Sequence, residues 1–150
     1  MTEAAVGRGG TRGCGMDAAR LVEQAERAMS GAPQPEAVIA EAWQAYELTE
    51  AVGRLLTAER HDGPVARAGP RPVVTASGGD PPRAERLTGV RDPDGTLRRL
   101  RTLLGEIGLA LVALTCTAAD EAAYWNCVEA LDAVDESKDR VRALSGAETG

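Results

Sequence analysis

The chain has 150 residues, a length that suits one ordinary domain, and 43% of them are hydrophobic, which is enough for a single core. Phe is absent and aromatic residues make up only 3%, so the core must consist of Ala, Leu, Val and Ile, which suit closely packed helices. A formal net charge of -6 repels phosphate backbones and anionic lipid surfaces, which argues against binding to nucleic acid or to a membrane.

Residues 1–15 contain two arginines and five glycines but no apolar run, so they are not a secretory signal. We expect a disordered head, or a translation start assigned too early, with Met16 as the natural start. The cysteines are Cys14, Cys116 and Cys127, a sparse set without a CxxC pair, which favours a reduced cytoplasmic setting. The longest uncharged stretch is too short for a membrane-spanning helix, which needs about 20 residues.

The first half of the chain predicts two helices. Apolar residues recur at three-to-four spacing over 17–30, with Asp17 as the N-cap and Gly31 at the end. Pro35 suits the start of a second helix, expected over 36–60, because its missing N–H has no partner there. The first helix is too short to cover all of the second. The apolar residues expected to stay uncovered are Val52, Leu55 and Leu56.

The middle of the chain, residues 61–95, holds six of the eight prolines and six of the 17 glycines. Too few apolar residues remain to offset the entropy lost when such a segment is ordered. We therefore expect a flexible connector, with room for one helical turn over 82–88.

The second half carries the strongest periodic pattern and predicts a helix over 96–117. Another helix is expected over 119–145, started by a capping box of Thr117 with Asp120 or by Asp120 alone. The turn between them is short, so the two helices should form an antiparallel hairpin. The apolar seam of the first of them steps by three and four residues through Leu97, Leu100, Leu104, Ile107, Leu111 and Leu114.

Together these elements predict an all-α fold: an irregular antiparallel four-helix bundle made of two helical hairpins joined by the Gly/Pro-rich connector. It would form a single domain over 16–146, followed by a tail at 147–150. Three arginines at the start of the third helix oppose the helix dipole, so we expect them to approach acidic residues across the second hairpin. The expected pairs join Arg98, Arg99 and Arg101 to Asp135, Glu136 and Asp139.

Nothing in the sequence forms a catalytic constellation. No serine lies in a Gly-x-Ser-x-Gly setting, and His61 is the only imidazole. Four carboxylates share one face of the last helix, but no Glu-x-x-His pair accompanies them, so we interpret them as a solvated surface. We expect no catalytic residues, no cofactor and no bound metal, and hence no enzyme.

Two glycines inside the third helix, Gly105 and Gly108, each cost about 1 kcal/mol relative to Ala, so something should compensate. Close approach of another helix is one compensation, and a ligand-sized gap beside Trp43 or Trp125 is the other. A small-ligand or metal site would then lie near two aromatic pairs. The pairs are Trp43 with Tyr46 and Tyr124 with Trp125.

Two segments, Ala40 to Gly53 and Tyr124 to Arg142, resemble an uncharacterised family of small proteins from high-GC actinomycetes. The resemblance covers Met16 to about Leu144 and is weakest in the connector. It implies a helical fold and a cytoplasmic bacterial setting, but no reaction, cofactor or site residue.

The favoured hypothesis is a non-enzymatic helical module that binds a protein partner or forms a homodimer through its uncovered face. The alternative is a bundle that binds a small ligand or a metal beside the aromatic pairs.

Overall fold

The structure is a computed structural model and describes residues 15–31, 33–61 and 82–149. The predictions for residues 1–14 and 62–81 lie outside these ranges. The described part is mostly helical, as the sequence predicts. Its elements, in chain order, are β2 (Met16–Asp17), α1 (Ala18–Ser30), α2 (Pro35–His61), α3 (Arg83–Arg86), β3 (Leu87–Gly89), α4 (Pro93–Cys116) and α5 (Glu121–Thr149).

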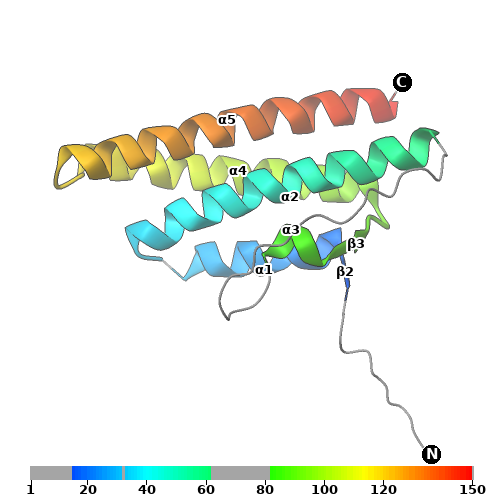
Figure 1. Ribbon diagram of the computed structural model, residues 1–150, viewed down its shortest axis with the longest axis horizontal. Helices are drawn as coiled ribbons and strands as arrows, with labels where there is room; N and C mark the ends of the chain where they lie inside the picture. The colour runs from blue at the N-terminus through cyan, green and yellow to red at the C-terminus, as the bar shows by residue number, and fades with distance from the viewer. Residues whose placement is uncertain (1–14, 32, 62–81, 150) are drawn as a thin grey trace, which may run out of the picture.

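The long helices lie roughly along one direction, and α5 returns beside α4 after the turn that joins them (Figure 1). Helix α5 packs against α4 and α2, whereas α1 packs against α4 and α2 from the other side. Helices α2, α4 and α5 therefore form the centre of the fold, and the shorter α1 covers part of it.

Side-chain caps begin three of these helices. Asp17 Oδ2 accepts a hydrogen bond from Ala19 N at 3.0 Å, and Asp120 Oδ1 accepts one from Ala123 N at 2.8 Å, so the caps at Asp17 and at Asp120 alone are confirmed. The capping box with Thr117 is wrong, because Thr117 ends α4 and its hydroxyl donates to Ala113 O and Leu114 O of that helix. Helix α4 begins at Pro93, earlier than predicted, because Asp92 caps it and proline needs no partner at the first helical position. Helix α5 continues to Thr149, past its predicted end.

The predicted seam of α4 forms the centre of the core. Five of its residues are at most 1% exposed, and the sixth, Leu114, packs at the edge. The prediction of an uncovered face on α2 is wrong, because Val52 is 0% and Leu56 4% exposed and Leu55 packs against the core. The long helix α5 covers this part of α2, where the Arg140 side chain lies over Gly53.

The predicted flexible connector is also wrong for its last part, residues 82–95, which is ordered. The helical turn expected over 82–88 is confirmed as α3. It is followed by β3, which pairs in parallel with β2 through Met16 and Leu87. The sequence did not predict this strand pair. The prediction considered only the shortage of apolar residues, whereas an ion pair attaches this segment to α2. Arg83 Nη1 lies 2.6 Å from Glu41 Oε1 on α2.

The arginines at the start of α4 do not pair as predicted. Arg99 Nη2 lies 2.6 Å from Glu26 Oε1, because α1 packs along this side of α4. In the described part of the chain, neither Arg98 nor Arg101 has a carboxylate within ion-pair distance, and both are exposed. Asp139 pairs with Arg142 on its own helix.

Candidate functional site

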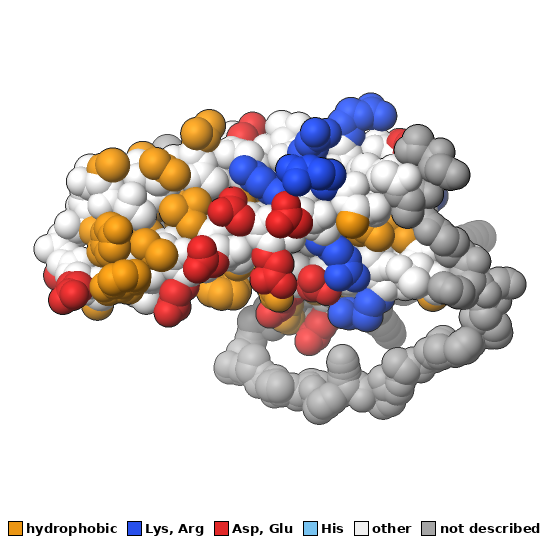
Figure 2. Space-filling view, turned by 90° about the horizontal axis from the view of Figure 1, so that it is seen from above, with side chains coloured by type: hydrophobic (Ala, Val, Ile, Leu, Met, Phe, Trp, Pro, Cys, Tyr) orange, Lys and Arg blue, Asp and Glu red, His pale blue; other side chains and the backbone are white. Residues whose placement is uncertain are grey.

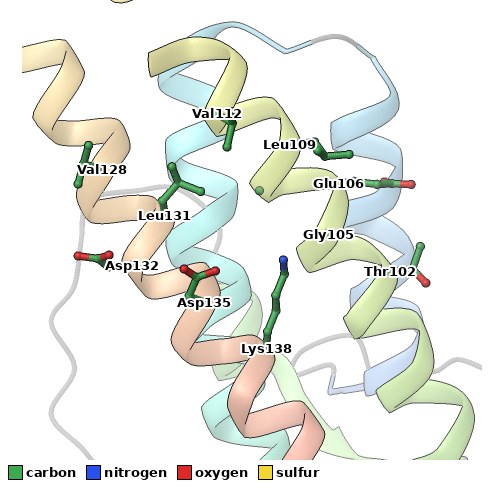
Figure 3. A pocket seen from close by; sticks show the side chains of 11 residues that line it. Thr102, Gly105, Glu106, Leu109, Val112, Val128, Leu131, Asp132, Asp135 and Lys138 are labelled. Carbon is green, nitrogen blue, oxygen red and sulfur yellow. The ribbon is translucent and has the colours of Figure 1, made fainter. Parts of the chain in front are cut away.

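A groove with a volume of about 780 Å³ runs along the outer side of α4 and α5. Figure 3 shows its walls, which come from both helices. Helix α4 contributes Thr102, Gly105, Glu106, Gly108, Leu109 and Val112, and α5 contributes Val128, Leu131, Asp132, Asp135 and Lys138. The groove lies on the opposite side of α4 from the buried leucine seam.

One end of the groove is apolar and open to solvent. Leu109 is 74% exposed and Val112 is 49% exposed, and Val128 and Leu131 of α5 also line the groove. This end of the groove therefore presents large aliphatic side chains to solvent.

Glycines form the floor of the groove. A methyl group at Gly108 would lie 3.7 Å from Val134 Cγ1, so the close approach of α5 compensates for this glycine. A methyl group at Gly105 would meet nothing within 4 Å. Open space therefore lies beside Gly105. The ligand-sized gap was expected beside Trp43 or Trp125, and neither of these residues lines the groove.

The rest of the groove carries charge. Carboxylates of Glu106, Asp132 and Asp135 line it, and Lys138 reaches from α5 toward Gly105 (Figure 3). No carboxylate among the described residues lies within ion-pair distance of the Lys138 ammonium, which sits 3.8 Å from the position that a Gly108 methyl would take. The groove thus combines an acidic rim with one unpaired cation.

The aromatic residues predicted to surround a ligand form two separate pairs. The ring centroids of Trp43 and Tyr46 are 6.0 Å apart, and those of Tyr124 and Trp125 are 5.2 Å apart. Among the residues described, no ring contact joins one pair to the other, and none of the four lines the groove. Trp125 is 53% exposed near the start of α5. Figure 2 shows hydrophobic side chains gathered at the end of the molecule where α4 turns into α5.

Tyr46 belongs to a polar cluster between α2 and α5. The negative charge of Glu136, followed by burial and by the charge of Glu50, raises the pKa of Tyr46 above 10.0. Arg140 Nη1 lies 3.5 Å from Glu50 Oε1, and its guanidinium covers Gly53. This cluster holds the two helices in register and leaves no open space for a ligand at Gly53.

The cysteines and the possible metal ligands of the described residues form no further site. Cys116 is exposed and Cys127 buried, and neither is in a disulfide. Over the described ranges, no three His, Cys, Asp or Glu side chains are grouped so that they could hold a metal ion. No described helix has both the length and the apolar character needed to cross a membrane.

The profile of one protein family matches residues 16–145, which include both segments that carry the resemblance and the whole groove. The chain belongs to DUF6099, a family of unknown function. The match confirms the resemblance to an uncharacterised family, while the actinomycete source stays a prediction. No curated protein and no solved structure matches this DUF6099 chain.

The sequence-based search for sites missed Leu109, Val112 and Gly105, although a signal was present. These residues recur at three-to-four spacing on α4, offset from the buried seam, so the helix carries two apolar lines. Only one of the two can face the core of a small domain.

Proposed function

We propose that this DUF6099 protein is a non-enzymatic helical interaction module, in which the groove between α4 and α5 binds an amphipathic helix of another polypeptide chain. Helices α1, α2, α4 and α5 would form an irregular antiparallel bundle, and α4 and α5 would present the groove from its open side. The proposal keeps the predicted cytoplasmic setting, in which Cys116 and Cys127 stay reduced.

The observation that carries the proposal is the highly exposed Leu109 beside the open floor at Gly105. A groove between two neighbouring helices accepts a third helix, whose apolar side chains pack between theirs. Because Gly105 has no side chain, the backbone of the incoming helix can come close there. Leu109, Val112 and Leu131 then supply the apolar surface that loses contact with water.

Charge defines the chemistry of the partner helix. Glu106, Asp132 and Asp135 line the groove, and the chain as a whole has a formal charge of -6. A helix with Lys or Arg beside its apolar face is attracted to this surface, and an acidic helix is repelled. Lys138 offers a place for one carboxylate or for the carbonyl groups at the end of a helix.

An open groove of this kind suits a helix better than a small ligand. Binding sites for small molecules enclose most of the ligand surface, whereas Leu109 projects into solvent at 74% exposure. The exposed ring of Trp125 extends the same apolar end of the molecule, so a bound helix could continue along it.

The test uses a fluorescent synthetic peptide about 18 residues long, or about five helical turns, with Leu on one face and Lys beside it. Its anisotropy should rise saturably when the protein is added. Leu109→Asp should weaken binding at least about tenfold, because it places a charge in the apolar end of the groove. Ala58→Asp, which adds the same charge to an exposed position on α2, should bind normally.

A second peptide with Glu in place of Lys tests the charge argument. It should bind at least about tenfold more weakly than the Lys peptide, with the difference shrinking as salt is added. Equal binding of the Lys peptide to the wild-type protein and to Leu109→Asp would show that the groove is not the site.

A further inference from the structure

We propose that the helix bound in this groove is α4 of a second copy of the chain, packed antiparallel about a two-fold axis at the level of Ile107. This inference depends on the proposed function, because it requires the groove to be a helix-binding site. It identifies the partner as this same chain and specifies which residues meet.

The outer face of α4 carries a second line of residues with the spacing of a coiled-coil seam. The residues step by four, three, four, three and four positions: Arg98, Thr102, Gly105, Leu109, Val112 and Cys116. All of them are exposed except Gly105, which is half-buried on the floor of the groove. A repeat of 3.5 residues keeps such a line facing one neighbouring helix over several turns.

This outer line is symmetric about Ile107. A two-fold axis at that level places Leu109 opposite Gly105 of the second copy and Val112 opposite Thr102. The same axis places Cys116 opposite Arg98, so every position of the line meets another position of the line. A symmetric dimer requires this reciprocity, in which residue i contacts residue j and residue j contacts residue i.

Shape complementarity follows at the central pair. Leu109 projects into solvent at 74% exposure, and the space above Gly105 is empty out to 4 Å from the position of a methyl group. Leu109 is therefore a knob and the space above Gly105 a hole, and the two lie one helical turn apart on the same face of α4. In a dimer built about the axis, Leu109 of each copy fills the hole above Gly105 of the other, so the dimer contains two of these contacts.

Charge complementarity fixes the same orientation. Arg98 and Arg101 are exposed and lack ion pairs over the described ranges, whereas Arg99 is already used by Glu26. The turn after Cys116 carries the exposed carboxylates of Asp120 and Glu121. The antiparallel arrangement brings Arg98 of one copy to this acidic turn of the other, whereas a parallel arrangement would stack Arg98 on Arg98.

A disulfide experiment tests the register. Arg98→Cys is introduced together with Cys14→Ser, so that the new thiol and the native Cys116 are the exposed pair. Oxidation should give a covalent dimer as the main product. Within one copy, positions 98 and 116 are about 27 Å apart along the helix, at a rise of 1.5 Å per residue, so no intramolecular disulfide competes.

Two controls accompany this variant. Cys14→Ser alone should stay uncrosslinked, because the axis separates the two copies of Cys116. Thr102→Cys in the same background is a matched exposed position on the same line, and it should crosslink far less because it meets Val112. Equal crosslinking of Arg98→Cys and Thr102→Cys would overturn the register.

The central contact is tested by exchanging the residues at positions 105 and 109. Sedimentation equilibrium measures the dimer dissociation constant of each variant. Gly105→Leu should raise the dimer dissociation constant at least about tenfold, because two leucines then collide. Leu109→Gly should raise it as well, because the knob is lost. The double variant Gly105→Leu/Leu109→Gly should regain affinity, since the knob and hole have changed places and still meet across the axis. Circular dichroism verifies that each variant is folded.

The outcomes separate this inference from the proposed function. A protein that stays monomeric up to about 1 mM, a concentration at which even weak complexes form, overturns the inference. If the Lys peptide still binds that monomer and loses affinity in Leu109→Asp, the groove remains a helix-binding site with another partner. If the peptide also fails to bind, both proposals are wrong. A dimer unaffected by Leu109→Asp overturns the inference alone.

Discussion

Arg83 and Glu41 form a two-point ion pair, with Nη1 2.6 Å from Oε1 and Nη2 3.2 Å from Oε2, and their side chains are only 12% and 11% exposed. The backbone N–H of Arg83 also donates to Gln44 Oε1 at 3.1 Å. The helical turn α3 is thereby attached to α2, and β3 follows directly to pair with β2. A polar contact across the fold thus orders a segment that is poor in apolar residues.

Arg83→Ala should lower the free energy of unfolding by about 3 kcal/mol, because it leaves the Glu41 carboxylate buried without its partner. Urea denaturation measures the change. The matched control is Arg142→Ala, which removes an exposed pair with Asp139 and should change stability by less than about 1 kcal/mol. Equal effects of the two substitutions would show that the Arg83 pair is only a surface contact.

The two aspartate caps should differ in strength. Asp120→Ala should cost about 1 kcal/mol, the usual value for the loss of an N-cap. Asp17→Ala should cost more, because Asp17 Oδ1 also accepts a hydrogen bond from Arg91 N at 2.8 Å and so joins α1 to the segment before α4. Thermal unfolding of both variants compares them, and a smaller loss for Asp17→Ala would contradict the tether.

The glycines of the helices should respond differently to Ala. Gly105→Ala should raise the free energy of unfolding by about 1 kcal/mol, because Ala favours the helix and meets empty space. Gly53→Ala should gain less or lose stability, because its methyl would lie 2.9 Å from Arg140 Nη2 and displace the guanidinium from Glu50. Urea titrations at one low protein concentration keep any dimerisation out of the comparison. A larger gain for Gly53→Ala would contradict this account.

The titration of Tyr46 should report its contact with Glu136. In Tyr124→Phe, Tyr46 is the remaining tyrosine, and the ultraviolet absorbance of its phenolate should appear with a pKa above the ordinary value of 10.0. Glu136→Gln should lower this pKa, because the largest cause of the shift is the charge of Glu136. A pKa unchanged by Glu136→Gln would remove Glu136 as the cause.

The same shift sets a direction for stability. Since the folded-state pKa is raised, the folded protein holds the phenol proton more tightly than the unfolded chain. The contribution to stability is fully present below pH 10.0 and is lost as pH rises through the raised pKa of Tyr46. Tyr46→Phe should therefore flatten the loss of stability in alkaline solution, which urea titrations at a series of pH values would measure.

The longer helices and two of their caps could be predicted from local patterns. The leucine spacing of α4 and the caps at Asp17 and Asp120 depend on residues within a few positions of one another, so the sequence shows them directly. The membership of Leu97 and Ile107 in the core follows from the same spacing.

Contacts between distant segments could not be predicted in this way. The sequence shows that Arg99, Val52 and Leu109 exist on helix faces, but the partner of each face depends on how the helices are placed in space. The structure puts Arg99 against α1, covers Val52, and leaves Leu109 open.

The sequence by itself therefore determined the helical class, the caps at Asp17 and Asp120 and one buried seam, because hydrogen bonding and periodicity within a helix are local. Only the tertiary structure decided which of the two lines on α4 is buried. Both lines have helical spacing, and α1, α2 and α5 can surround only one side of that helix. The line left outside, with Leu109 beside Gly105, became the groove because no element of the described chain packs over it.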